Sequence, residues 1–293
     1  MENIRDVTIL QEVSLKNYNT YKIDAKCKYL ALVSSTIGLI DLLKYLKDNN
    51  ISYMILGNGS NVILDEYFDG VIIKLGGLNY VNIEDKKVTV GAGTMMGKLT
   101  MDTIEQDLTG LEWAVNIPGT VGGSIVGNAG AYNSEMFDNL VSIKVLNKSL
   151  EVEEMAKSDF QYSYRHTNIK DLGLIVLEAT FLLEKGKKQD SKQTIKDRVM
   201  RRKSSQPLDM PSAGSVFRNP DGDYAGRLIE AVGLKGKRIG DAEVSSKHAN
   251  FIVNTGNATG KDIKNLIKLI KEEVKKEFNI DLVLEQEIID WKD

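Results

Sequence analysis

Three glycine-rich stretches of this chain could bind a phosphate through their backbone. They are GNGSN at residues 57–61, GAG at 91–93 and IPGTVGGSIVGNAGAY at 117–132. Successive peptide N–H groups in such turns form concave anion sites, and glycine lets a diphosphate approach the main chain. A strand–strand turn would explain GNGSN if it stood alone. The three together favour a large diphosphate cofactor that lies across several turns.

Two common nucleotide-binding fingerprints do not fit these stretches. In GNGSN, Val62 stands where G-x-G-x-x-G needs its third glycine, and no helix fits before the strand expected at Val71. In GAGTMMGKLT at 91–100, Ala92 and Leu99 replace the first glycine and the hydroxyl of a P-loop. A Rossmann dinucleotide site and an NTPase are therefore disfavoured.

Composition removes several further classes of protein. The length of 293 residues suggests two domains or three small ones, and the net charge of −3 gives no basic field for nucleic acid. Cys27 is the only cysteine, which excludes an internal disulfide and suits a reducing compartment. With only His166 and His248 beside it, a structural zinc site is disfavoured, and neither histidine lies near a G-x-S-x-G elbow.

The chain shows no feature of export or membrane insertion. Its N-terminus lacks a basic region followed by a long apolar core, and no window approaches about 18 consecutive apolar residues. We therefore expect a cytoplasmic protein that binds neither membrane nor nucleic acid.

Apolar periodicity predicts the elements that position these stretches. Thr259 is expected to cap a long helix with an apolar stripe of Ile263, Leu266, Ile267, Ile270, Val274 and Phe278. Other helices are expected at 37–50, 98–108 and 194–203. Strands are expected at 53–56, 71–75, 88–90, 141–146, 174–183, 248–254 and 282–289.

Two segments interrupt this pattern. The uncharged stretch 113–132 is predicted to be an ordered loop, neither helix nor strand. KGKKQDSK at 185–192 is predicted to be a charged linker at a domain boundary. The expected organisation is a module at 1–187, with subdomains at about 1–78 and 79–187, followed by a domain at 188–293.

Six motifs together carry a resemblance to a known family. GNGSNVIL, IPGTVGGSIVGNAGAY, YRHTNIK, PSAGSVFRNP, KHANFIVN and LEQEII occur in this order, and the likeness runs from about Asn17 to the C-terminus. The chain thereby resembles the UDP-N-acetylenolpyruvoylglucosamine reductases, the MurB family. Its first two-thirds also resembles the vanillyl-alcohol-oxidase type of FAD-binding fold. The implied fold is α+β, with a two-subdomain, non-Rossmann FAD module and a C-terminal substrate-binding domain.

The resemblance implies a reaction on small molecules. NADPH reduces non-covalently bound FAD and leaves, after which UDP-N-acetylglucosamine enolpyruvate takes a hydride at its methylene carbon and a proton at the neighbouring carbon. The product is UDP-N-acetylmuramate, a peptidoglycan precursor. The alternative is another FAD-dependent oxidoreductase of the same cofactor fold, such as an oxidase. A third hypothesis is a non-catalytic nucleotide-sugar-binding protein. The presence of Arg165, Ser215 and Glu287 together argues against it.

The same resemblance implies three catalytic residues. Ser215 would donate the proton, although a turn serine often bonds only its own backbone. Arg165 would pair with the substrate carboxylate through a two-pronged hydrogen bond. Glu287 is the expected glutamate partner, and Glu285 competes because residues two apart in a strand share a face.

The arginine motif departs from the family pattern YR-x-S-x-F. Thr167 stands in place of the serine and Ile169 in place of the phenylalanine. A hydroxyl and an apolar anchor are both retained, so Arg165 keeps its expected role.

The remaining site residues follow from the motifs. Asn219 is expected at the substrate diphosphate or sugar, against the alternative of a turn asparagine. Tyr132 is expected in the substrate site, near the isoalloxazine, against the alternative of a core tyrosine. Arg201, Arg202 and Lys203 could supply positive charge or form a solvated helix face. His248 is expected to be structural. The FAD residues are Gly57, Asn58, Gly59, Ser60, Asn61, Gly119, Thr120, Gly122, Gly123, Ser124 and Asn128.

Overall fold

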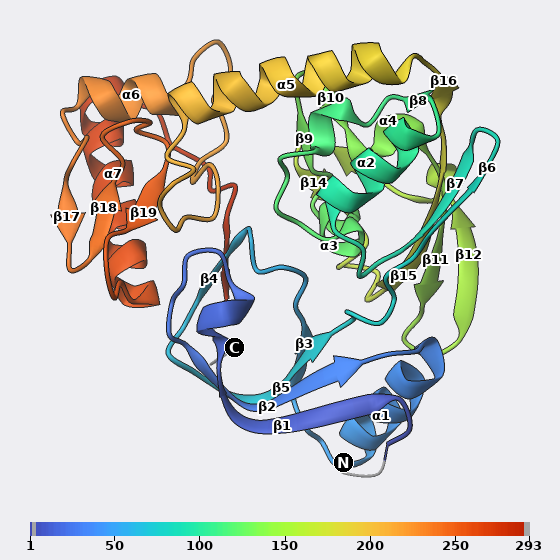
Figure 1. Ribbon diagram of the computed structural model, residues 1–293. Helices are drawn as coiled ribbons and strands as arrows, with labels where there is room; N and C mark the ends of the chain where they lie inside the picture. The colour runs from blue at the N-terminus through green and yellow to red at the C-terminus, as the bar shows by residue number, and fades with distance from the viewer. Residues whose placement is uncertain (2–3, 290–293) are drawn as a thin grey trace. The chain divides into compact units, whose positions relative to one another are not determined.

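The computed structural model describes residues 1 and 4–289, and the chain divides into two compact units. Unit 1 comprises residues 1–11, 29–58 and 70–199, and unit 2 comprises residues 12–28, 59–69 and 200–293 (Figure 1). The division falls inside helix α5 (Lys188–Ser205). The predicted domain boundary between residues 187 and 188 stays a prediction.

Unit 1 is built on a five-stranded antiparallel sheet. Its order is β12 (Val152–Ala156), β11 (Leu140–Leu146), β15 (Ile175–Leu182), β7 (Lys87–Gly91) and β6 (Val81–Glu84). Alternate residues such as Ile143, Ala179 and Val90 are fully buried in the core. Helix α3 (Val121–Val126) packs on β15 and β7, and α2 (Met96–Glu105) packs on β6.

Helix α1 (Thr36–Asp48) packs in a second hydrophobic cluster of unit 1. The helix predicted at 37–50 is confirmed. Its stripe of Leu39, Leu42, Leu43 and Leu46 is buried against residues of β2 (Lys26–Val33) and β5 (Tyr67–Lys74). The strands lie in the order β1 (Val7–Ser14), β2, β5 and β3 (Tyr53–Ile55), and β3 runs parallel to β5. The chain thus enters the GNGSN turn directly from a strand, as the sequence predicted.

The prediction of a loop at 113–132 is wrong in part. The stretch contains part of the 3-10 helix η2 (Glu112–Ala114), all of α3, and β9 (Gly130–Ala131), which pairs with β10 (Ser134–Glu135). Thr120 caps α3 by accepting a hydrogen bond from the Gly123 N–H over 3.3 Å. Val121 and Ile125 are fully buried. This packing outweighs the low helix propensity of the two glycines.

The predicted linker at 185–192 is helical from Lys188 onwards. Lys188 and Lys192 both form ion pairs with Glu105 of α2. Ser191 is buried and donates to the Glu112 carboxylate over 2.6 Å. These contacts hold the start of α5 against unit 1. The smaller elements of this unit are β8 (Leu108–Thr109), α4 (Met136–Asn139), η3 (Lys157–Asp159), β13 (Tyr162–Ser163), β14 (His166–Thr167) and β16 (Glu184–Lys185).

Unit 2 combines a small sheet with two helices. The antiparallel strands β17 (Arg238–Ile239), β18 (Ala242–Val244) and β19 (Ile252–Asn254) lie beside α7 (Gly260–Phe278), which also contacts α6 (Ala225–Ala231) (Figure 1). Thr259 caps α7 in a reciprocal pair with Asp262, as predicted. The predicted stripe of α7 is buried except for Phe278, which is half-buried.

The C-terminal segment of unit 2 is shorter as a strand than predicted. Only β20 (Glu287–Ile289) is a strand, and it runs parallel to β4 (Val62–Leu64). Leu284 forms an isolated bridge with Phe217. The 3-10 helix η1 (Leu15–Tyr18) completes the unit. Both units mix helices with antiparallel strands, and the predicted α+β class is confirmed.

Candidate functional site

Two of the glycine stretches pack directly against each other in unit 1. A Cβ atom built on Gly57 would lie 2.9 Å from the Thr120 hydroxyl oxygen, so only glycine fits there without displacement. The Asn58 side-chain amide donates to the carbonyl oxygen of Pro118 over 2.5 Å. Residues 57–58 and 118–120 therefore form one backbone surface. That they share one ligand stays a prediction.

The peptide groups of this surface can still donate. Among the described residues, no hydrogen bond uses the N–H of Gly57, Asn58, Gly119 or Thr120. Glycine-rich turns with unused N–H groups are typical anion sites. The arrangement fits the diphosphate of FAD, since small residues allow close approach and several donors remain available.

Lys74, at the end of β5, is a residue of this surface that the sequence analysis missed. Its ammonium group donates to the carbonyl oxygen of Gly57. Burial lowers the pKa of Lys74 to about 8. The sequence offered no signal, because a lysine after an apolar strand usually marks a surface edge.

The last three residues of GNGSN belong to unit 2 and are anchored there. Gly59 has φ +63°, and a Cβ on it would lie 2.3 Å from the carbonyl oxygen of Tyr18. The Asn61 amide donates to the carbonyl oxygen of Glu285 over 3.0 Å, and the Glu287 N–H donates to the Asn61 carbonyl oxygen over 2.9 Å. The turn is thereby joined to the C-terminal strand. Ser60 is half-buried.

The other predicted FAD residues of unit 1 lie in or next to α3. Gly122 packs on Ala92, where a Cβ would lie 2.9 Å from the alanine Cβ. The hydroxyl of Ser124 is buried and has no hydrogen-bond partner among the described residues. Asn128 is fully buried and donates to the Ser163 carbonyl oxygen over 2.9 Å. Asn128 therefore connects this stretch to the hairpin that carries Arg165.

Arg165 lies in the tight connection between β13 and β14, with φ +57°. This left-handed conformation is uncommon for a residue other than glycine, asparagine or aspartate. The guanidinium group donates to the carbonyl oxygens of Gly130 and Asn128 and lies 4.7 Å from the centre of the Tyr164 ring. A strained backbone that aims a charged fork is a frequent feature of functional sites.

The two substitutions in the arginine motif keep the packing of its loop. The Thr167 hydroxyl donates to the Val126 carbonyl oxygen over 2.7 Å, and Ile169 is fully buried. Threonine thus supplies the hydrogen bond, and isoleucine supplies the apolar anchor.

Ser215 lies in unit 2, on an irregular segment whose preceding residue, Gly214, has φ +76°. The serine is half-buried, and its hydroxyl makes no hydrogen bond among the described residues. The alternative of a serine that bonds its own backbone is therefore not observed. Val216 and Phe217, which follow it, are buried.

Glu287 and Glu285 flank the buried Gln286 in the same segment of unit 2. Gln286 is 3% exposed, Glu285 is half-buried and Glu287 is exposed. Alternation along the extended chain directs both glutamates away from the face that buries Gln286. The choice of Glu287 over Glu285 stays a prediction.

The two predicted substrate residues, Tyr132 and Asn219, both contact neighbouring parts of the chain. Tyr132 and Asn133 form a two-residue hairpin connection in which both φ angles are positive, at 56° and 60°. The Tyr132 ring lies under the Arg198 guanidinium group at 4.7 Å and packs on the core of unit 1. Asn219 is exposed and accepts from the Ala225 N–H over 3.1 Å at the start of α6. Their substrate roles stay predictions.

Residues expected to be structural or peripheral lie in unit 2. His248 accepts a hydrogen bond from the Asn250 N–H over 3.2 Å, and burial lowers the pKa of its imidazole, in agreement with a structural role. Arg201 and Lys203 are exposed on α5, and Arg202 bonds the Gln206 side chain over 2.9 Å. They remain candidates for positive charge.

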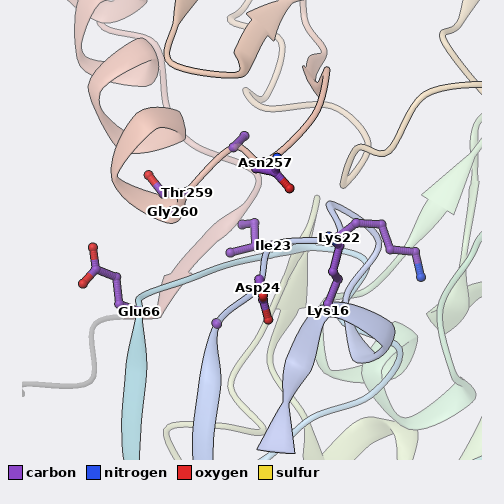
Figure 2. A pocket seen from close by; sticks show the side chains of 10 residues that line it. Lys16, Lys22, Ile23, Asp24, Glu66, Asn257, Thr259 and Gly260 are labelled. Carbon is purple, nitrogen blue, oxygen red and sulfur yellow. The ribbon is translucent and has the colours of Figure 1, made fainter.

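Unit 2 also has a small pocket, which is separate from the predicted site residues. It has a volume of about 80 Å³ and is lined by residues that include Lys16, Lys22, Glu66, Asn257 and Gly260 (Figure 2). Sites for organic ligands usually occupy about 300–1,000 Å³. Since none of the predicted site residues lines this pocket, we do not assign it to the substrate.

Metal and membrane features can be judged for residues 1 and 4–289. Within that range, no cluster of three or more histidine, cysteine, aspartate or glutamate residues could hold a metal ion. No helix there has the length and apolar character required to span a bilayer.

Comparison with known proteins identifies the family of the chain. Residues 27–155 match the profile of an FAD-binding domain, and residues 206–289 match that of the UDP-N-acetylenolpyruvoylglucosamine reductase C-terminal domain. A UDP-N-acetylenolpyruvoylglucosamine reductase of Clostridium novyi (strain NT) is 40% identical, over 99% of this chain and 95% of that relative. The chain belongs to the UDP-N-acetylenolpyruvoylglucosamine reductase family.

Other members of the reductase family give the same picture. A UDP-N-acetylenolpyruvoylglucosamine reductase of Caldanaerobacter subterraneus is 42% identical over 95% of this chain and 92% of that relative. The crystal structure of the MurB reductase from Thermus caldophilus has a TM-score of 0.82 and 33% identity, and the match covers 97% of this chain and 99% of that one. The family recognised from six short motifs is thereby confirmed, together with an FAD-binding domain of non-Rossmann type.

Proposed function

We propose that this chain reduces UDP-N-acetylglucosamine enolpyruvate to UDP-N-acetylmuramate, with FAD as cofactor and NADPH as co-substrate. The observation that carries the proposal is identity of about 40% to reductases of this name over nearly the whole chain. Arg165, Ser215 and Glu287 stand at the expected motif positions within that span. The product is a precursor of peptidoglycan, so the enzyme would act in cell-wall synthesis.

The bound cofactor would supply the hydride that NADPH provides. Backbone N–H groups at Gly57, Asn58, Gly119 and Thr120 would hold its diphosphate, and the remaining FAD residues predicted above would line the rest of the site. We assign this binding to a module at residues 1–187 and substrate binding mainly to residues 188–293.

Side chains of this protein would stabilise the negative charge on the substrate and donate the proton. Arg165 would pair with the substrate carboxylate and stabilise the negative charge that spreads into it after hydride addition. Ser215 would then give its hydroxyl proton to the adjacent carbon, which leaves an alkoxide on the serine. Because serine is a weak acid, a nearby cation or proton relay must stabilise that alkoxide. Glu287 would polarise the carboxylate-bearing end of the substrate.

The cellular setting follows from the same proposal. Both substrates are small, soluble nucleotides, and Cys27, the only cysteine of the sequence, is buried and cannot form an internal disulfide. A buried reduced cysteine suits a reducing compartment. We therefore place the reaction in the cytoplasm.

Anaerobic spectroscopy of purified protein tests the proposal. The protein should retain FAD, lose its visible flavin absorbance with NADPH, and regain that absorbance when UDP-N-acetylglucosamine enolpyruvate is added. Reoxidation by oxygen, with no response to the enolpyruvate, would favour the alternative of an FAD oxidase. Failure to bind FAD would contradict both.

A further inference from the structure

The buried side-chain amide of Gln286 anchors the backbone just before Ser215. The Gln286 side-chain NH₂ donates to the carbonyl oxygens of Ala213 and Gly214, over 3.0 and 3.2 Å. These are the two residues immediately before Ser215. Gln286 is 3% exposed. Its hydrogen bond to Ala213 is buried and shielded from water, and its hydrogen bond to Gly214 is partly buried.

The other end of the same amide is also fixed. The Tyr21 hydroxyl, fully buried, donates to the Gln286 carbonyl oxygen over 2.9 Å. The Tyr21 backbone carbonyl in turn accepts from the Asn254 amide over 2.9 Å. The amide must therefore present its oxygen to Tyr21 and its nitrogen to the Ser215 segment. A glutamate could not serve here when ionised, because it would face two carbonyl oxygens with no proton to donate.

The residues after Ser215 are held by Asn250. The Asn250 side chain both accepts from the Phe217 N–H, over 3.0 Å, and donates to the Phe217 carbonyl oxygen, over 2.8 Å. Its backbone carbonyl accepts from the Val216 N–H over 2.9 Å. The backbone on both sides of Ser215 is thus fixed, although the serine hydroxyl bonds no described residue.

Backbone contacts next to Gln286 join this segment to the stretch that carries the C-terminal glutamates. The Glu285 N–H donates to the Val216 carbonyl oxygen over 2.9 Å, and Leu284 bridges Phe217. Gln286 therefore secures the chain before Ser215, and the backbone beside it secures the chain after. Glu287 is the next residue along the same strand segment.

We propose that Gln286 and Tyr21 are positioning residues for proton transfer, and that together they fix the Ser215 hydroxyl relative to the strand that carries Glu287. This inference rests on the proposed function. Neither residue touches the reacting atoms. Their effect should fall on the step that uses Ser215 and spare the reduction of the flavin by NADPH.

The test compares the two half-reactions of Gln286→Met and Tyr21→Phe by anaerobic stopped-flow absorbance. Gln286→Met keeps the volume and removes every side-chain hydrogen bond, and Tyr21→Phe removes only the hydroxyl. Flavin reduction by NADPH should change less than about twofold, while reoxidation by the enolpyruvate slows about 10- to 100-fold in Gln286→Met. Tyr21→Phe should show the same effect, more weakly. The loss should appear in kcat rather than KM.

Controls separate positioning from general damage. Gln189→Met, at an exposed site on α5, should behave as wild type in both half-reactions. If Gln286→Met does not fold, Tyr21→Phe carries the test. The inference is overturned if Tyr21→Phe reoxidises at the wild-type rate, or if both half-reactions slow together. If the wild-type protein itself does not respond to the enolpyruvate, the proposed function fails instead.

Discussion

The Arg165 guanidinium group donates a hydrogen bond to the carbonyl oxygen of Gly130 and so connects two short hairpins of unit 1. The β13–β14 connection supplies the arginine in a left-handed conformation, and the β9–β10 hairpin supplies the surface that receives it. A Cβ atom on Gly130 would lie 2.9 Å from the Arg165 Nη1 atom and 2.3 Å from the Ser134 carbonyl oxygen. The position of the guanidinium group therefore depends on glycine at residue 130.

Gly130→Ala should displace the guanidinium group and slow the substrate half-reaction. We expect reoxidation of the flavin by the enolpyruvate to fall about 10- to 100-fold. The free energy of unfolding should drop by about 1–3 kcal/mol, since backbone must move to admit the methyl group. Gly127→Ala is the matched control, because its Cβ would meet only the Gly123 carbonyl oxygen at 3.6 Å. Equal rates of flavin reoxidation in the two variants would show that Gly130 does not determine the position of the Arg165 guanidinium group.

Lys74 should make FAD affinity depend on pH. Burial lowers its pKa to about 8, so the ammonium form beside Gly57 is present below that pH and is lost above it. A diphosphate stabilises the charged form, and affinity for FAD should therefore weaken as the pH rises through about 8. Apoprotein titrated with FAD should show this by fluorescence quenching.

The variant Lys74→Met should weaken FAD binding about 10- to 100-fold near neutral pH, as expected for loss of a charge-assisted hydrogen bond. It should also flatten the pH profile around 8. Lys47→Met, at an exposed position on α1, should retain the wild-type profile. A Lys74→Met protein with unchanged affinity would remove Lys74 from the cofactor site.

Glutamine substitutions should separate Glu287 from Glu285. Loss of the Glu287 carboxylate should slow the substrate half-reaction by about 100-fold, because a charge that polarises the substrate is removed. Glu285→Gln should keep most activity, since it retains the backbone N–H and carbonyl oxygen that bond Val216 and Asn61. Steady-state kcat and KM for both variants check this. A reversed pattern would assign the role to Glu285.

Periodicity was sufficient for the elements that bury one continuous face. Helix α7, with its Thr259 cap, and helix α1 were predicted because their stripes repeat at helical spacing. Helix α3 was missed, since glycine-rich sequence has low helix propensity and only tertiary burial of Val121 and Ile125 stabilises it.

Some residues of the candidate site could likewise be predicted from the sequence, and others could not. The motif residues were identifiable because each lies in a short recognisable stretch. Tyr21 and Gln286 were missed because they bond across 265 positions in sequence, and no local pattern records such a contact. Thr167 and Ile169 were expected to retain a hydroxyl and an apolar anchor. The partner of that hydroxyl, the Val126 carbonyl oxygen, and the full burial of Ile169 are known only from the structure.

The most direct test is Ser215→Ala, followed through both half-reactions under anaerobic conditions. Flavin reduction by NADPH should stay within about twofold of wild type, while reoxidation by UDP-N-acetylglucosamine enolpyruvate should fall by about 10²- to 10⁴-fold. Ser204→Ala, an exposed serine on α5, should reproduce wild-type rates in both. A Ser215→Ala protein that reduces the enolpyruvate at the wild-type rate would contradict the assignment of Ser215 as proton donor.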